Sequence, residues 1–293
     1  MSHIYEKVDQ YLFNGNIVCL SCHKQYPIVN GIFYMHPIKC RGTKHNWNKH
    51  YCLRKVNVDV RHFSDIRTFL TYFSLGRLAI KSGIRCNNSI EIGSGTGTYS
   101  LWLKKLKIIN NAYLVDVSEN AIKASQELFR ELDEKAYFVL ADGLALPFRD
   151  KSFDLSLSGG LIEHFDEEER QNIVHEHCRV SNKVLCQIPL NNPAYWVGRY
   201  LQCLFYRGWP FGYEKPSSLR EIEKMFSAEN FLVEFVSYHD LLTAAAFRLS
   251  KKFCERNPLK NKGYVNKIFR HEVVVYAYER HNRNKRHAYE KKF

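Results

Sequence analysis

The chain has 293 residues, of which 45% are apolar, and a formal net charge of +13. This length suffices for one large α/β domain with a small addition, and the absence of any charge-free run of 18 residues excludes a typical membrane-spanning helix. The N-terminus has no hydrophobic targeting core, so we expect a cytoplasmic protein. Nine cysteines without a regular spacing predict reduced thiols rather than a disulfide framework.

Residues 1–60 are expected to form a small β-rich module of their own. Cys19 and Cys22 have the Cys-x-x-Cys spacing of one pair of zinc ligands, and residues 17–33 resemble half of a zinc-ribbon-like module. The chain has no second pair with this spacing. Four later residues could complete a tetrahedral site, but their spacing matches no known ribbon; they are Cys40, His45, His50 and Cys52.

The alternative for this segment is a metal-free β-hairpin. Its strands would be residues 16–19 and 28–34, around a turn at Asn30 and Gly31, and Tyr26 and Phe33 would form its core. Asn-Gly is favoured in tight hairpin turns because both positions need a positive φ angle.

The main domain is expected to span residues 61–280, with a leading helix at residues 63–81. An apolar strand ends at Glu91, and a helix begins near Ser100 after a loop with three glycines, at positions 93, 95 and 97. Glycine permits a tight turn and leaves no Cβ between the backbone and a ligand, while the helix start offers free N–H groups. Thr98 stands where the dinucleotide fingerprint needs Gly or Ala, so the loop predicts a nucleotide-like ligand of another kind.

Two acidic residues follow at the ends of the next two expected strands. Asp116 lies in the strand at residues 112–118, about 20 residues beyond the glycines, where a carboxylate accepts hydrogen bonds from ribose hydroxyls. Asp142 and Gly143 follow the short strand at residues 136–140. Ser118 is a good N-cap for a helix over residues 119–132, so a purely structural role for Asp116 is the alternative. Asp142 and Gly143 are likewise a common turn pair.

The fourth strand is preceded by Leu-Pro-Phe-Arg-Asp-Lys-Ser-Phe-Asp at residues 146–154 and followed by Leu-Ile-Glu-His at residues 161–164. Taken together, the four motifs resemble the class I S-adenosylmethionine-dependent methyltransferases over roughly residues 63–279. The resemblance implies an α/β fold with a Rossmann-like, seven-stranded, mostly parallel sheet whose last strand is antiparallel. The ribbon-like N-terminal half-module is similar to the activator subunit of several tRNA and protein methyltransferases.

This resemblance implies S-adenosylmethionine as the cofactor and assigns residues to its parts. The glycine loop would pass the methionine part, with Glu91 near its ammonium group. Asp116 would bind the ribose, Asp142 and Gly143 the adenine, and the end of the fourth strand, including Gly160, would lie beside the methyl group. The implied cofactor-binding set is Glu91, Gly93, Ser94, Gly95, Gly97, Asp116, Val117, Asp142, Gly143, Ser158 and Gly159.

The chemistry expected of such a site is direct displacement, which needs neither a metal nor a covalent intermediate. If the acceptor atom carries a proton, a general base within hydrogen-bond reach assists the transfer. His164 is the candidate, because it follows the fourth strand and titrates near neutral pH. The alternative is that His164 only orders the loop.

The rest of the main domain carries the substrate side. We expect a strand at residues 183–188, an insertion at residues 190–216, a capped helix starting at Ser218, and two last strands at residues 231–239 and 271–279. The insertion holds eight aromatic residues between positions 195 and 213 and little charge, which favours a planar or lipid-like acceptor. The alternative is that these aromatic side chains form the core of a lid.

Positive charge concentrates near the two ends of the chain, at residues 39–61 and in a tail, residues 281–293, that we expect to be disordered. Basic ends favour contact with RNA phosphates or with an anionic membrane surface. The leading hypothesis is therefore a methyltransferase acting on a small or lipid-like acceptor, and the second is an RNA methyltransferase. A third is a catalytically silent protein with a cofactor-binding fold that binds a partner.

Overall fold

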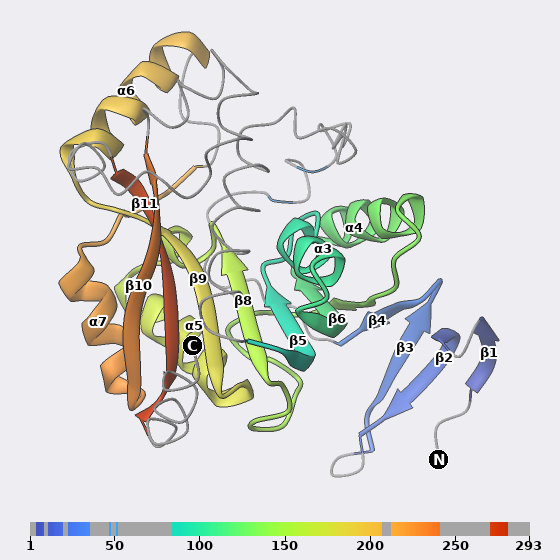
Figure 1. Cartoon of the computed structure of the whole chain (residues 1–293). Coiled ribbons are helices and arrows are strands. Elements are labelled where there is room, and N and C mark those ends of the chain that lie inside the picture. The colour runs from blue at the N-terminus through green and yellow to red at the C-terminus, as the bar shows by residue number, and fades with distance from the viewer. Residues whose placement is uncertain are drawn as a thin grey trace.

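The computed structural model describes residues 4–8, 11–19, 23–35, 47, 51, 84–206, 212–240 and 270–280. Its described strands form one sheet in the order β1-β2-β3-β4-β7-β6-β5-β8-β9-β11-β10 (Figure 1). The strands are β1 (Ile4–Val8), β2 (Tyr11–Val18), β3 (Gln25–Val29), β4 (Ile32–Tyr34), β5 (Cys86–Ile92), β6 (Ile109–Asp116), β7 (Tyr137–Leu140), β8 (Leu155–Gly159), β9 (Lys183–Pro189), β10 (Phe231–Asp240) and β11 (Arg270–Glu279).

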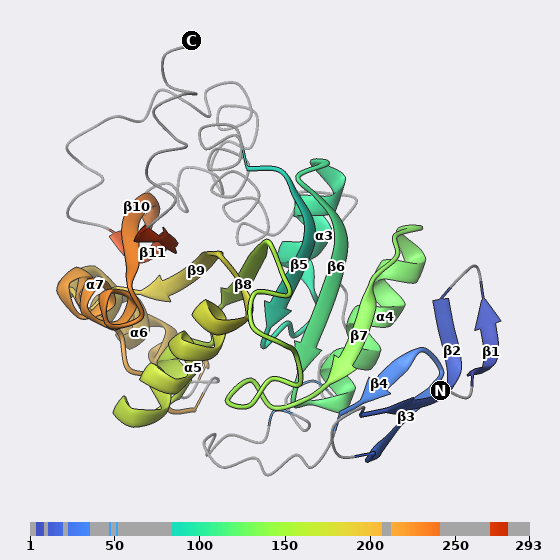
Figure 2. The ribbon, with the colours of Figure 1, turned by 90° about the horizontal axis from the view of Figure 1, so that it is seen from below.

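Seven of these strands, β5 to β11, make the sheet that the sequence predicts. Strands β7, β6, β5, β8 and β9 are parallel neighbours, as Figure 2 shows from below. Strand β11 runs antiparallel between β9 and β10. The Rossmann-like α/β fold with an antiparallel last strand is therefore confirmed. Because parallel strands share one carboxyl edge, the loops that follow β5, β6, β7 and β8 meet at that edge.

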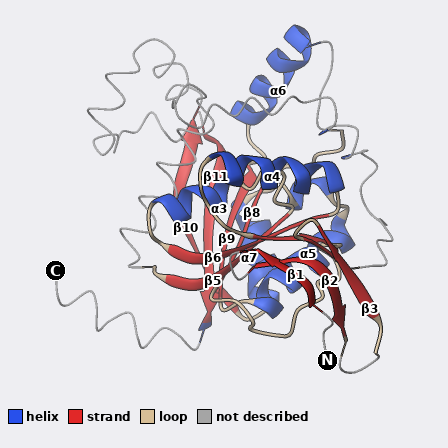
Figure 3. Cartoon of the chain, turned by 90° about the vertical axis from the view of Figure 1, so that its right-hand side faces the viewer, coloured by secondary structure: helices blue, strands red, loops and turns tan. Residues whose placement is uncertain are grey.

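Helices cover both faces of this sheet (Figure 3). Helices α3 and α4 pack on one face, and α5 and α7 pack on the other, which explains why the central strands are buried almost throughout. The helices are α3 (Thr98–Lys105), α4 (Glu119–Glu131), α5 (Glu167–Val180), α6 (Pro193–Tyr206) and α7 (Leu219–Ala228), with a short 3₁₀ helix η1 (Ile162–His164).

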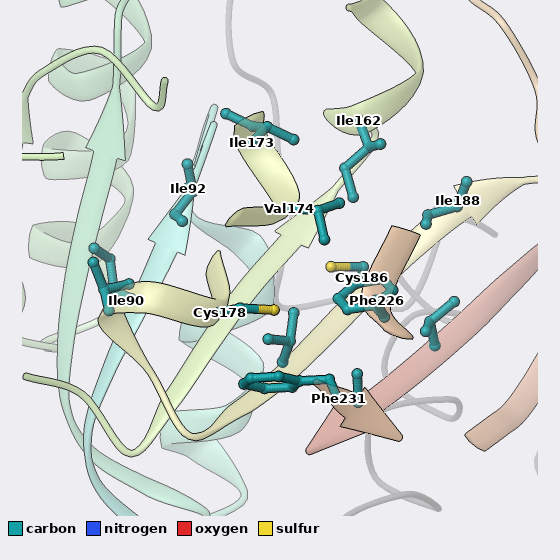
Figure 4. Close-up of a cluster of buried hydrophobic side chains, with 14 of the residues drawn as sticks. Ile90, Ile92, Ile162, Ile173, Val174, Cys178, Cys186, Ile188, Phe226 and Phe231 are labelled. Carbon is teal, nitrogen blue, oxygen red and sulfur yellow. The ribbon is translucent and has the colours of Figure 1, made fainter. Parts of the chain in front are cut away.

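Each face has its own hydrophobic core, because successive strand residues point to opposite sides of a sheet. Ile90 and Ile92 of β5 point to the same core as Cys178 of α5 and Phe226 of α7, and all four are buried (Figure 4). Leu101 of α3 belongs to the core on the opposite face.

Three helix starts follow the local signals in the sequence. The Ser118 hydroxyl caps α4 by accepting from Ala121 N at 3.2 Å. Asp166 caps α5 in the same way. Ser218 and Glu221 form a reciprocal capping box at the start of α7. These caps satisfy N–H groups that have no partner inside the helix, and each contributes about 1 kcal/mol.

The N-terminal strands continue the sheet, because β4 pairs in parallel with β7. The expected turn is present: Asn30 and Gly31 have φ angles of 51° and 76° and connect β3 to β4. The expected single strand over residues 28–34 is wrong, since this turn divides it. A module boundary near residue 60 stays a prediction.

The interior of this hairpin also differs from the expectation. Its buried side chains are Ile28 and Ile32, whereas Tyr26 and Phe33 are only partly buried. Two hydrogen bonds connect the hairpin to α4. The Tyr34 hydroxyl donates to Glu119 at 3.0 Å, and Gln126 donates to the carbonyl of Asn30 at 2.7 Å.

The expected insertion at residues 190–216 contains a helix, α6, that the Gly and Pro residues of this segment did not suggest. Within the described residues, no helix is long and apolar enough to cross a membrane. The predicted helix at residues 63–81 and the tail at residues 281–293 lie outside the described residues.

A buried polar cluster joins β8 to the end of α5. His177 is fully buried, its Nδ1 lies 2.9 Å from Ser156 Oγ, and Ser181 Oγ donates to Ser156 Oγ at 3.0 Å. His177 Nε2 has no hydrogen-bond partner within the described part of the chain. Burial lowers the pKa of His177 to about 3, because a charged imidazolium would lie here away from water.

This cluster predicts a pH dependence of stability. The pKa of His177 is lower in the folded than in the unfolded chain, so the unfolded chain takes up the proton first and stability falls as the pH drops below about 6.5. His177→Gln removes this titration. Between pH 7 and pH 5 we expect the wild type to lose about 2 kcal/mol more than the variant in urea unfolding, and equal losses would contradict the assignment.

Candidate functional site

A pocket lies at the carboxyl edge of the parallel strands, where the predicted cofactor site would be. The loops after β5, β6, β7 and β8 contribute most of its wall. The lining residues are Trp47, Tyr51, Gly93, Val115, Asp116, Val117, Ala141, Asp142, Gly143, Leu144, Gly160, Leu161, His164 and Phe165.

The glycine loop follows β5 and lines the pocket through Gly93. Gly93, Gly95 and Gly97 all have positive φ angles, of 64°, 54° and 71°, which glycine adopts without strain. A Cβ on Gly97 would lie 2.6 Å from the side chain of Leu114. The loop therefore needs glycine both for its backbone path and for its close packing on β6.

Glu91 lies beneath this loop, on β5, with an exposed fraction of 2%. Its Oε2 accepts a hydrogen bond from Ser100 N at 2.8 Å, in the first turn of α3. Gly97, the N-cap of α3, has no side chain for this purpose, so Glu91 caps the helix from the sheet. Burial raises the pKa of Glu91 to about 7, and the hydrogen bonds from Ser100 and Tyr99 oppose this shift.

Asp116 is the last residue of β6, and its carboxylate connects this strand to the glycine loop. One carboxylate oxygen accepts from Gly95 N at 2.8 Å and the other from Ser118 N at 2.8 Å. The register of β5 and β6 pairs Ile92 with Val115, which places the two strand ends side by side. Burial raises the pKa of Asp116, while the backbone N–H donors favour its charged form.

Asp142 and Gly143 follow β7 and line the next part of the wall. Asp142 Oδ1 accepts from Leu144 N at 2.9 Å, so the side chain also closes its own turn. The position after β7 is the one that the resemblance implies for the adenine edge.

The end of β8 is arranged differently from the implied pattern. Ser158 is buried, and its hydroxyl donates to Cys186 Sγ on β9 at 3.3 Å. The ring of Tyr99 lies where a Cβ on Gly159 would be, and its hydroxyl donates to Gln187. Gly160, with a φ angle of 70°, is the residue of this strand end that lines the pocket.

His164 closes the β8 side of the pocket and is mostly buried. Its Nδ1 lies 2.8 Å from the carbonyl oxygen of Tyr213. A carbonyl oxygen only accepts hydrogen bonds, so the network assigns the hydrogen of the neutral ring to Nδ1 and the lone pair to Nε2. This is the tautomer that a general base in the pocket requires.

Two aromatic residues near the N-terminus complete the lining, and the sequence analysis did not predict them. The ring centroids of Trp47 and His164 are 4.9 Å apart at 73°, an edge-to-face contact. The Tyr51 hydroxyl lies where a Cβ on Gly95 would be. Both residues are helical and spaced i, i+4, a pattern that indicates a shared face but not the surface that it meets.

Among the predicted cofactor-binding residues and the candidate base, the structure brings six into the pocket lining, namely Gly93, Asp116, Val117, Asp142, Gly143 and His164. The other predicted residues lie behind or beside that lining, namely Glu91, Ser94, Gly95, Gly97, Ser158 and Gly159. Their roles toward a cofactor stay predictions.

The candidate zinc ligands are only partly within the described chain. Cys19 directly follows β2, and Cys22, Cys40, His45, His50 and Cys52 lie outside the described residues. Among the residues that the structure describes, no group of three His, Cys, Asp or Glu side chains is arranged to hold a metal ion.

Residues 90–183, about a third of the chain, match a family model described as "Methyltransferase domain". The matched segment runs from β5 to the start of β9 and contains the glycine loop, Asp116, Asp142 and His164. The match agrees with the predicted resemblance to S-adenosylmethionine-dependent methyltransferases over this segment.

Two curated proteins are similar to part of the chain. The chloroplastic 2-methyl-6-phytyl-1,4-hydroquinone methyltransferase 2 of Oryza sativa subsp. japonica is 28% identical over 113 residues, which are 38% of this chain and 31% of that protein. The demethylmenaquinone methyltransferase of Roseiflexus sp. (strain RS-1) is 33% identical over 82 residues, which are 28% of this chain and 34% of that protein. The chain thus spans about a third of the length of these relatives.

Among solved structures, the PH0226 protein from Pyrococcus horikoshii OT3 is similar with a TM-score of 0.54 and 15% sequence identity. The likeness covers 80% of this chain and 100% of that protein. At this identity it supports the fold alone.

The Glu91 cap predicts different effects for two substitutions. Glu91→Ala leaves the N–H of Ser100 without its buried acceptor and should cost about 1–3 kcal/mol in urea unfolding. Glu91→Gln keeps an acceptor oxygen and should cost less.

The pH dependence of the same variants has a defined sign. Because the pKa of Glu91 is higher in the folded chain, wild-type stability falls as the pH rises from about 4.5 to about 7. Gln does not titrate, so the stability of Glu91→Gln relative to the wild type should rise between pH 5 and pH 8 by roughly 1–3 kcal/mol. A constant difference over that range would show that Glu91 is not protonated in the folded chain.

Proposed function

We propose that this protein transfers a methyl group from S-adenosylmethionine to a small, lipid-like acceptor. The observation that carries the proposal is the hydrogen bond from Gly95 N to Asp116, which joins the glycine loop and the acidic strand end at one pocket. Residues 90–183, which include both partners, match a methyltransferase domain.

The polar groups around the pocket fit this cofactor. Asp116 offers a carboxylate for the ribose hydroxyls, and Asp142 with the backbone of Gly143 offers partners for the purine edge. Ser94, beside Gly93, is 6% exposed, and its hydroxyl has no hydrogen-bond partner among the described residues. Such a group is expected to gain a partner when a polar ligand binds.

When bound there, S-adenosylmethionine supplies an activated methyl group that an acceptor atom takes by direct displacement at carbon, with the bonding pair leaving on sulfur. The residues of the chain then hold the two reactants in line and exclude water. Trp47, Leu161 and Phe165 are among the apolar residues of the lining. For an acceptor hydroxyl or acidic carbon, His164 Nε2 accepts the proton that the acceptor releases.

The acceptor class rests on the relatives and on the pocket together. Both curated relatives are named for prenylated quinone-type acceptors, which combine a planar ring with an apolar tail. The described lining contains two acidic residues, Asp116 and Asp142, and both lie in the part assigned to the cofactor. The remaining lining, with Trp47 and His164 at its edge, suits an uncharged aromatic ring.

The first test is cofactor binding by calorimetry. The wild type should bind S-adenosylmethionine, and Asp116→Ala should bind it with a loss of about 1.5–3 kcal/mol, the range for hydrogen bonds to a charged group. Absence of binding by the wild type at millimolar ligand would end the proposal.

A matched control separates this effect from a general loss of structure. Asp133 is an exposed residue in the turn after α4, at the opposite edge of the sheet, and Asn tolerates its φ angle of 53°. Asp133→Asn should therefore keep wild-type affinity. Thermal unfolding of Asp116→Ala should be recorded with it, because Asp116 also accepts from Ser118 N.

The role of His164 is tested by turnover on a prenylated hydroquinone with radiolabelled methyl donor. His164→Ala should lower kcat about 100-fold while leaving cofactor affinity within about threefold of the wild type. His164→Asn is the sharper variant, because its amide can still donate to the carbonyl of Tyr213 but cannot accept a proton.

The pH profile distinguishes a base from a packing residue. Wild-type kcat should rise with pH as the imidazole loses its proton, and this rise should be absent from the residual activity of both variants. Full activity of His164→Asn would show that His164 is not a base and only orders the loop.

The RNA hypothesis rests on the charge at residues 39–61 and in the tail, most of which lies outside the described residues. Labelling of fractionated cell extract with radiolabelled methyl donor compares the two acceptor classes directly. Label in the lipid fraction supports the proposal, whereas label confined to RNA, with salt-sensitive binding, would replace it.

A further inference from the structure

Helix α6 presents an apolar face to solvent. Five of its side chains are exposed by 45% or more, and they are Trp196 (49%), Val197 (54%), Tyr200 (65%), Leu201 (45%) and Leu204 (60%). Their i, i+1, i+4, i+5 and i+8 spacing places them along one stripe of the helix. We call this stripe the α6 face. It holds five of the eight large apolar side chains that are exposed in the described chain.

The opposite side of α6 is fixed to the protein. Tyr195 is 5% exposed, and its hydroxyl donates to Glu214 at 3.1 Å. Arg199 donates to the Tyr195 hydroxyl at 2.9 Å and to the carbonyl of Glu214 at 3.2 Å. The exposed stripe is therefore held outward by a specific buried attachment, and Figures 1 and 3 show α6 standing away from the sheet.

The segment that carries the α6 face is positively charged, and the acidic residue Glu214 lies on the attached side of the helix with Tyr195. Residues 190–213 contain Arg199 and Arg207 and no Asp or Glu, within a chain of net charge +13. The guanidinium of Arg199 lies 5.6 Å from the ring centre of Trp196, so a cation stands at the border of the stripe. An apolar face with Trp, Tyr and Leu, bordered by arginine, is typical of a helix that lies in a bilayer interface.

The α6 face is connected to the pocket. Helix α6 follows β9, whose parallel pairing with β8 puts its carboxyl end at the pocket edge of the sheet. The segment that anchors Tyr195 and Arg199 also touches the pocket, because the Tyr213 carbonyl accepts from His164 and Lys215 N donates to the carbonyl of Glu163.

We propose that the α6 face docks the protein on the surface of an anionic lipid bilayer. Docking would let the pocket take a lipid-like acceptor directly from the bilayer, and this part of the proposal rests on the proposed function. Docking itself needs neither cofactor nor acceptor. The stripe enters the headgroup region while Arg199, at its border, meets lipid phosphates.

The test is flotation of the full chain with two kinds of vesicle, phosphatidylcholine alone and phosphatidylcholine mixed with phosphatidylglycerol. The wild type should bind the mixed vesicles, more weakly at high salt, and should bind the neutral ones at least several-fold less. Tyr200→Glu and Leu204→Glu should each weaken binding to mixed vesicles about tenfold, since each puts a charge on the face that would otherwise enter the bilayer.

A matched control carries the same change elsewhere. Val29 of β3 is 45% exposed and lies toward the other end of the sheet from β9, so Val29→Glu adds an equal charge outside the α6 face. It should float like the wild type. Circular dichroism and S-adenosylmethionine calorimetry on all four proteins should be unchanged, which shows that the variants are folded.

Three results would overturn the proposal. The first is no flotation of the wild type, and the second is equal losses in Val29→Glu and Leu204→Glu. The third is a wild-type dimer in sedimentation that Tyr200→Glu disperses, because a second copy would then cover the α6 face. In each case the proposed function still stands if the protein binds S-adenosylmethionine in calorimetry. If instead the protein floats with the vesicles but does not bind S-adenosylmethionine, the docking surface stands and the proposed function falls.

Discussion

One hydrogen bond defines the geometry of the candidate site. The N–H of Gly95 reaches the carboxylate of Asp116, and this contact holds two loops from neighbouring strands in one arrangement. Neither partner can be moved alone: Gly95 sits in a left-handed conformation with the Tyr51 hydroxyl against it, and Asp116 is fixed from the other side by Ser118 N. Pre-organisation of this kind lowers the entropic cost of binding, because the two loops are already ordered before a ligand arrives.

Local signals account for the part of the fold that the sequence predicts. Ser118 and Ser218 are caps whose partners lie three residues away, so the signal and the structure are in the same few residues. The order of strands and acidic residues likewise repeats a known pattern. By contrast, the pairing of β4 with β7 joins segments about a hundred residues apart, and nothing local specifies it.

The sequence predicts those residues of the site that lie at the ends of strands. Asp116 and Asp142 follow strands that were expected, so their meeting at one edge follows from parallel pairing. The motif does not indicate that Glu91 also accepts from Ser100 N at the start of α3, because that contact depends on how the helix packs on the sheet. Its role toward a cofactor stays a prediction. Trp47 and Tyr51 come from a segment outside every motif, and only tertiary packing brings them to the pocket.

The added N-terminal hairpin has a consequence for the integrity of the sheet. Strand β4 occupies the hydrogen-bonding groups on the outer side of β7, which is the border of the seven-stranded sheet. A version of the chain trimmed to the matched domain would uncover that border, and uncovered strands recruit other strands into aggregates. Strand β4 therefore protects one border of the seven-stranded sheet, and its removal should favour aggregation of the remaining fold.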